Sequence, residues 1–147
     1  MTIDPTVADL LAKARTAQAL YEKFNQSEVD DVVAAIAWVV LEPVRNQHLS
    51  ERAVEDTGLG DIDDKFTKNY RKTLGLLRDL TGAPSVGVIA TNSKRGLVEI
   101  ARPIGVVGAI TPSTNPVATP TNKVMNALKG GNAIILAPSP RGEAGCG

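Results

Sequence analysis

Cysteine and histidine are almost absent from this sequence: its 147 residues include one of each, Cys146 and His48. A single cysteine excludes an internal disulfide and any metal site built from several thiolates. Cys146 lies near the end of the chain with no local histidine or lysine-rich setting to activate its thiol, so it is not predicted to be a nucleophile. A lone histidine beside polar residues is typical of a solvated helix, and no metal site is predicted.

An excess of charge of one sign is also missing. Sixteen basic residues balance sixteen acidic ones, and aromatic residues make up 3% of the chain. Nucleic-acid binding is disfavoured because no basic stripe interleaved with aromatics is present. The longest apolar run, residues 32–41, is too short to span a bilayer, and the first residues, MTIDPTVADL, lack the features of a secretory signal. We therefore expect a cytoplasmic protein with no membrane partner.

The first half of the chain has helical periodicity. Asp4 followed by Pro5 predicts a helix start, and Ser27 with Asp30 resembles a capping box at the start of a second helix. Pro43 should kink or end that second helix. The predicted helices span residues 5–23, a second stretch from 27 to Pro43, 50–57 and 62–80.

The second half begins with two β-rich pieces, residues 85–90 and 96–101, separated by a polar turn that predicts a hairpin. A buried strand at 104–110, a helix at 117–128 and a buried strand at 132–136 then form one βαβ unit. The predicted fold class is α/β: an N-terminal helical layer, a β-hairpin and the first βαβ unit of an incomplete Rossmann-like sheet. The composition shift at residues 82–84 divides a helical segment, 1–83, from the hairpin and the start of a nucleotide-type domain, 84–147.

Residues 105–118, GVVGAITPSTNPVA, carry the candidate site because a strand here delivers a polar loop to a helix N-terminus. Asn115 is the candidate catalytic residue, since its amide can donate hydrogen bonds to a developing charge. From chemistry alone, an ordinary turn and helix cap remains the more common role of TPSTNP. Glu55 and Asp56 fit a solvated helix end, and Trp38 and Met125 fit core packing.

Two stretches resemble the aldehyde dehydrogenase superfamily, in particular its CoA-acylating branch. The first, residues 102–140, reads RPIGVVGAITPSTNPVATPTNKVMNALKGGNAIILAPSP, and the second, residues 53–69, reads AVEDTGLGDIDDKFTKN. The acetaldehyde, propionaldehyde and sulfoacetaldehyde enzymes of that branch are the types resembled. The resemblance extends over nearly the whole chain, which corresponds to about the first third of a family member.

The resemblance implies an NAD(P)-dependent enzyme that oxidises a small aldehyde through a cysteine thioester, with CoA as co-substrate. Asn115 matches the family's oxyanion donor. Ala137 stands where hydrolytic members have lysine, which favours the acylating branch and leaves NAD or NADP open. The implied cofactor-binding residues are Thr111, Pro112 and Ser113 along the nicotinamide side and Ala137, Pro138 and Ser139 near the adenosine.

The resemblance also places the nucleophilic cysteine beyond Gly147, so the 147-residue piece is expected to be inactive alone. In the family the hairpin takes part in oligomerisation, which implies that residues 86–100 contact a second subunit in a homo-oligomer. The alternative is a non-catalytic, truncated module that acts in assembly through this hairpin and the apolar helices.

Overall fold

The computed structural model describes residues 3–140, beginning with four helices. These are α1 (Pro5–Tyr21), α2 (Gln26–Leu41), α3 (Pro43–Thr57) and α4 (Ile62–Leu80). Asp4 caps α1 by accepting a hydrogen bond from the backbone N–H of Thr6 at 2.8 Å, as predicted. The capping box of α2 is formed by Asn25 and Glu28, so the prediction that used Ser27 and Asp30 is wrong.

Pro43 ends one helix and begins the next. It occupies the first position of α3, where its missing N–H costs no hydrogen bond. The Glu42 side chain accepts hydrogen bonds from the backbone N–H groups of Val44 and Arg45 and caps this helix. The prediction of a short helix over residues 50–57 is therefore wrong, because α3 starts at Pro43.

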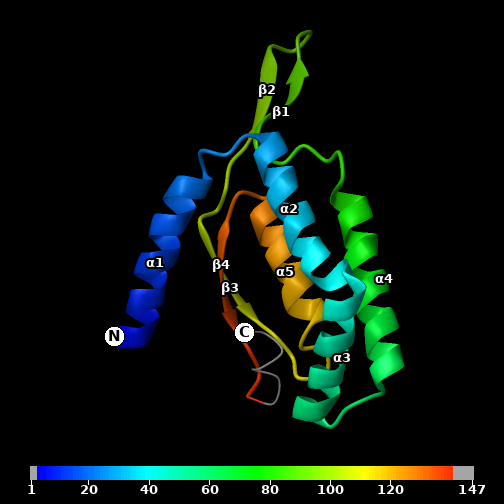
Figure 1. Ribbon diagram of the computed structural model, residues 1–147. Coiled ribbons are helices and arrows are strands. Elements are labelled where there is room, and N and C mark those ends of the chain that lie inside the picture. The colour runs from blue at the N-terminus through cyan, green and yellow to red at the C-terminus, as the bar shows by residue number, and fades with distance from the viewer. Residues whose placement is uncertain (1–2, 141–147) are drawn as a thin grey trace.

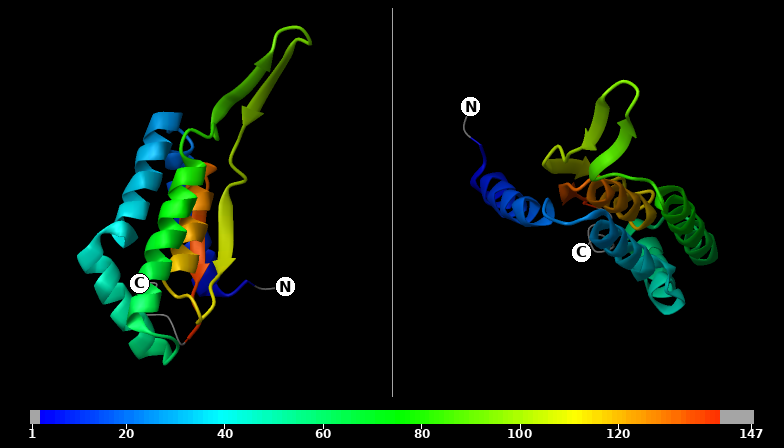
Figure 2. Two further views of the ribbon diagram at one scale, coloured as in Figure 1. Left: turned by 90° about the vertical axis from the view of Figure 1, so that its right-hand side faces the viewer. Right: turned by 90° about the horizontal axis from the view of Figure 1, so that it is seen from above.

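The strands follow in the second half. β1 (Gly87–Asn92) and β2 (Leu97–Ala101) form an antiparallel hairpin. β3 (Val106–Ile110) is followed by α5 (Ala118–Lys129) and β4 (Ala133–Ala137), and β3 pairs in parallel with β4. The predicted hairpin and βαβ unit are thus confirmed. In Figures 1 and 2 the hairpin projects away from the rest of the molecule.

The helices cover the βαβ unit unevenly. α5 packs against α2 and α4, and α1 contacts β3 and β4 from the other side of the strands (Figures 1 and 2). Met125 of α5 is fully buried against Val33, Ala37 and Leu41 of α2. The predicted core role of Met125 is confirmed, whereas Trp38 is 56% exposed and its predicted core role is wrong. Trp38 is not among the residues that pack in this cluster.

A buried polar cluster joins α3 to α4 beside the apolar core. Asn69 donates from Nδ2 to Oδ1 of Asn46 and to Oγ of Ser50, at 3.2 Å in each case. Asn46 in turn donates from Nδ2 to the carbonyl oxygen of Phe66 at 3.0 Å. Because these buried polar atoms have partners inside the protein, the cluster fixes the register of α4 against α3.

The strands of the βαβ unit are less covered than the sequence predicts. Ile104 is 92% exposed and Ile110 is 79% exposed, so the prediction of a wholly buried strand at 104–110 is wrong. Only Ala109 of β3 is buried. Among residues 3–140 the sheet containing β3 has two strands, so neither strand has a second neighbour there.

The turn between α5 and β4 is built on Gly131 and Asn132. Gly131 adopts φ +73°, a left-handed conformation that favours glycine. The Oδ1 of Asn132 accepts hydrogen bonds from the backbone N–H groups of Ile104 at 2.7 Å and Gly105 at 3.0 Å. Its Nδ2 donates to the carbonyl oxygens of Ala127 at 3.2 Å and Gly130 at 3.1 Å. Asn132 thereby ties the start of β3 to the end of α5.

Candidate active site

The predicted cofactor segments meet at the carboxyl ends of β3 and β4. The backbone N–H of Thr111 donates to the carbonyl oxygen of Ala137 at 3.0 Å, which extends the parallel ladder by one bond. Thr111 is 2% exposed, and Ser113 is partly buried. Pro112 and Ala137 are exposed, while Pro138 and Ser139 are partly buried. This edge of a parallel sheet is where open α/β folds hold their ligands.

Asn115 lies in the loop between β3 and α5. Its Oδ1 is buried and has no hydrogen-bond partner within the described part of the chain. The N-cap residue of α5 is Val117, and no side chain caps this helix end. An ordinary capping role for Asn115 therefore has no supporting hydrogen bond.

Lys65 holds this loop from α4. It is 5% exposed, and its Nζ donates to the carbonyl oxygen of Thr114 at 2.9 Å. Burial, with a further contribution from the positive charge of Lys68, lowers the pKa of Lys65 below its ordinary value. The contact fixes the backbone beside Asn115. Sequence reasoning missed Lys65, because the pairing spans 49 positions of the chain and depends on how α4 packs.

A second lysine acts at the end of β3. Lys123, in α5, donates from Nζ to the carbonyl oxygen of Ile110 at 2.5 Å. Ile110 is the last residue of β3, so the ammonium group lies at the same strand end as the loop that carries Asn115. This residue was also missed.

A cleft of about 300 Å³ opens beside Asn115 between α4 and α5. Lys68 and Lys72 line it from α4, and Asn122 lines it from α5. The Oδ1 of Asn122 is also buried without a partner among the described residues. Lys68 and Lys72 are four positions apart, the spacing that places two side chains on one helical face, and this was the signal that could have indicated the cleft.

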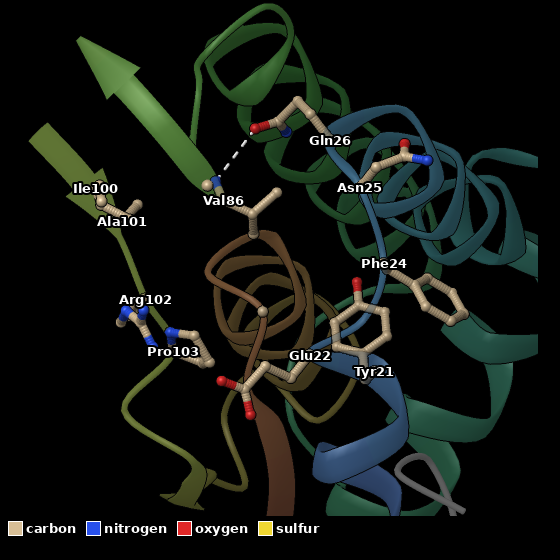
Figure 3. A pocket seen from close by; sticks show the side chains of 12 residues that line it. Tyr21, Glu22, Phe24, Asn25, Gln26, Val86, Ile100, Ala101, Arg102 and Pro103 are labelled. Atoms are coloured by element: carbon tan, nitrogen blue, oxygen red, sulfur yellow. Dashed lines mark hydrogen bonds between the residues drawn. The ribbon is translucent and has the colours of Figure 1, made fainter. Parts of the chain in front are cut away.

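A larger cavity, about 370 Å³, lies at the amino ends of the strands, at the base of the hairpin (Figure 3). Tyr21 and Glu22 line it from one side and Pro103 from the other. The Gln26 Oε1 accepts a hydrogen bond from the backbone N–H of Val86 at 3.2 Å beside it. This cavity contains none of the site residues predicted from the sequence, so we assign the chemistry to the carboxyl end.

The remaining candidates keep ordinary roles where the structure describes them. His48 is exposed on α3. Glu55 and Asp56 each form an ion pair with Arg52, at 3.4 Å and 3.3 Å. Cys146 lies outside the described residues.

Within residues 3–140, no group of three or more His, Cys, Asp or Glu side chains could hold a metal ion. No helix of this part of the chain has the length and apolar character needed to cross a membrane.

Comparison with known proteins gives consistent matches. The model of the aldehyde dehydrogenase family matches residues 4–145. A sulfoacetaldehyde dehydrogenase (acylating) from Cupriavidus necator is 61% identical over 140 residues, which cover 95% of this chain and 28% of that protein. The chain therefore spans less than a third of this relative's length.

Solved structures agree in fold. An acetylating aldehyde dehydrogenase from Geobacillus thermoglucosidasius superposes with a TM-score of 0.90 at 35% identity, over 96% of this chain and 31% of the other. A propionaldehyde dehydrogenase from Rhodopseudomonas palustris, solved with bound CoA, superposes with a TM-score of 0.76 at 32% identity, over 92% and 30% of the two chains. The α/β architecture expected from the sequence is confirmed.

Proposed function

Since the family model matches residues 4–145, the chain belongs to the aldehyde dehydrogenase family, and we propose that it is the N-terminal part of a CoA-acylating member. The observation that carries the acylating assignment is the 61% identity to the acylating enzyme from Cupriavidus necator. The proposed reaction converts a small aldehyde and CoA into an acyl-CoA. Because the chain covers 28% of that relative, the nucleophilic cysteine would come from the remainder of the enzyme.

The proposed role of Asn115 is to stabilise the oxyanion that forms when the nucleophile attacks the aldehyde carbonyl. Its amide has two N–H donors, and no capping hydrogen bond at α5 competes for it. Lys65 holds the adjacent Thr114 carbonyl, so the loop is positioned before the substrate arrives. Such preorganised donors act most strongly where charge develops.

We assign the nicotinamide cofactor to the carboxyl edge of β3 and β4. Thr111, Pro112 and Ser113 follow one strand, Pro138 and Ser139 follow the other, and the bond from Thr111 N to Ala137 O brings the two segments together. This arrangement suits a dinucleotide in the crevice outside parallel strands. A bound NAD or NADP would accept the hydride of the aldehyde, and CoA would take the acyl group.

The hairpin supports a proposed homo-oligomer. Val88 is 61% exposed, and Val98 and Ile100 are each 55% exposed, on an element that projects from the molecule (Figure 2). Strand edges with exposed apolar side chains are suited to pairing with another chain. The same observation favours the second candidate function, a non-catalytic module that acts in assembly.

A chimeric enzyme tests the proposed function. Residues 3–140 replace the matching segment of the Cupriavidus necator enzyme, and NAD(P)H and acyl-CoA are measured with and without CoA. We expect acyl-CoA formation that depends on CoA, with the unmodified relative as positive control. Release of free acid at the same rate without CoA would contradict the acylating assignment, and a folded but inactive chimera would favour the assembly module.

A further inference from the structure

The cleft beside Asn115 has a positive charge that the proposed role of Asn115 does not explain. Lys68 and Lys72 line it, and neither forms an ion pair with any residue that the structure describes. The proximity of Lys68 helps to lower the pKa of the buried Lys65, so the lysines of this face repel one another. Clustered cations of this kind favour binding of an anion.

Acidic side chains do not neutralise the cleft itself. Its lining residues are lysines, asparagines, Thr119 and Ala118. Asp64 is the one carboxylate lining the adjoining groove, which it shares with Lys68, Arg71 and Lys72. Four cationic side chains therefore line the two hollows with one carboxylate, so the positive charge is in excess; they are Lys68, Arg71, Lys72 and Lys123.

Two amide oxygens of the residues that line the cleft also lack partners among the described residues. They are the buried Oδ1 atoms of Asn115 and Asn122. A buried polar atom without a partner costs roughly 1–3 kcal/mol. An amide whose oxygen has no partner can turn about its Cβ–Cγ bond and present its N–H donors in place of that oxygen, so these side chains can adapt to a ligand oxygen.

The position of the cleft limits what can bind. Asn115 is one of its lining residues, and a cleft of about 300 Å³ lies at the lower limit for small-molecule sites. A small aldehyde whose carbonyl oxygen meets the Asn115 amide would extend its other end between α4 and α5, toward Lys68 and Lys72.

We propose that Lys68 and Lys72 bind an anionic group, a sulfonate or a carboxylate, carried by the aldehyde, with Asn122 as a polar neighbour. This inference rests on the proposed function and specifies its substrate class. A phosphate of CoA or of the dinucleotide has the same recognition chemistry, so the experiment includes those sources as separate outcomes.

The kinetic test uses the chimeric enzyme with sulfoacetaldehyde and, as a neutral aldehyde, acetaldehyde. In a Lys68→Met/Lys72→Met variant we expect kcat/KM for sulfoacetaldehyde to fall roughly 10- to 100-fold, mainly through KM, because charge-assisted hydrogen bonds are lost. Values for acetaldehyde should stay within about twofold. Lys68→Arg/Lys72→Arg should retain the preference for the anionic aldehyde, and Lys13→Met/Lys23→Met, exposed in and after α1, controls for the loss of charge alone.

Two kinetic outcomes would overturn the proposal. One is an equal loss for both aldehydes, and the other is a raised KM for CoA or NAD(P) with the aldehyde KM unchanged. Circular dichroism separates either result from unfolding of the variant.

A binding measurement keeps the inference independent of activity. In the 147-residue chain, ethanesulfonate should shift the side-chain amide signals of Asn115 and Asn122 in NMR spectra, and the double Met variant should abolish the shift. If ethanesulfonate bound saturably to a chimera that is inactive, the anion site would be supported and the proposed function would be contradicted. Absence of any shift would overturn the anion site whatever the activity.

Discussion

Two asparagines at opposite ends of the same βαβ unit differ sharply in their hydrogen bonding. Asn132, at the amino end, is 8% exposed and uses both atoms of its amide in four hydrogen bonds. Asn115, at the carboxyl end, leaves its buried Oδ1 without a partner among the described residues. The same side chain thus serves as a structural clamp in one place and stays uncommitted in the other.

The difference in hydrogen bonding indicates a structural role for Asn132 and a ligand-binding role for Asn115. Almost every buried polar group in a folded protein has a partner, so an exception needs an explanation. Asn132 meets the rule and joins α5 to β3. Asn115 departs from it at the strand end where α/β proteins place ligands, and its loop is held by Lys65 instead. We infer that Asn115 is retained for a ligand at some cost in stability.

Replacing Asn115 should give the largest effect. In the chimeric enzyme, Asn115→Ala should lower kcat roughly 100- to 1,000-fold, or about 3–4 kcal/mol, because one preorganised donor to the oxyanion is removed. Steady-state kinetics measures the loss. Thr114→Ala is the matched control: its backbone carbonyl, which accepts from Lys65, is unaffected by the substitution, so its kcat should change little.

Replacing Asn132 should change stability instead. Asn132→Ala should lower the free energy of unfolding by about 2–4 kcal/mol, since the backbone N–H groups of Ile104 and Gly105 lose their acceptor. Urea denaturation of the 147-residue chain, followed by circular dichroism, measures this loss. Asn132→Asp keeps the acceptor and loses the two donor bonds, so it should cost less. Equal stability of the Ala variant and the parent would contradict the clamp.

Lys65→Met should have a smaller effect on both quantities. The Thr114 carbonyl loses its donor, so kcat should fall roughly tenfold, or about 1.4 kcal/mol. Stability should change by less than about 1 kcal/mol, because the lost hydrogen bond is offset by removal of a buried charge. Kinetics of the chimera and urea denaturation of the chain check the two parts. An unchanged kcat would show that the loop keeps its position without Lys65.

The same variant has a pH signature. The folded pKa of Lys65 is lowered from 10.5, so the unfolded chain binds this proton more tightly than the folded one. The cost of the buried charge is full below the folded pKa and disappears as pH rises toward 10.5. The stability of the parent should therefore increase relative to Lys65→Met over that alkaline range, as urea denaturation at several pH values would show.

The elements that follow from local chemistry were predictable. Asp61 caps a helix whose bounds, 62–80, match the periodicity, and the strand–loop–helix around Asn115 follows from its turn residues. Tertiary packing decided the rest. The bond from Lys65 to Thr114 depends on how α4 lies against the loop before α5. The spacing of Lys68 and Lys72 indicates a shared helical face but not the element that this face opposes. Trp38 had the periodicity of a core residue without a neighbour to cover it.

The most direct test measures kcat and the thermal midpoint on the same preparations of Asn115→Ala and Asn132→Ala in the chimeric enzyme, at a temperature where both are folded. We predict opposite effects for the two variants. Asn115→Ala should leave the thermal midpoint unchanged and lower kcat by at least about 100-fold. Asn132→Ala should lower the thermal midpoint and retain most of the kcat. If Asn115→Ala kept near-normal turnover, or lost it only in proportion to unfolding, Asn115 would be a turn residue and the catalytic assignment would be wrong.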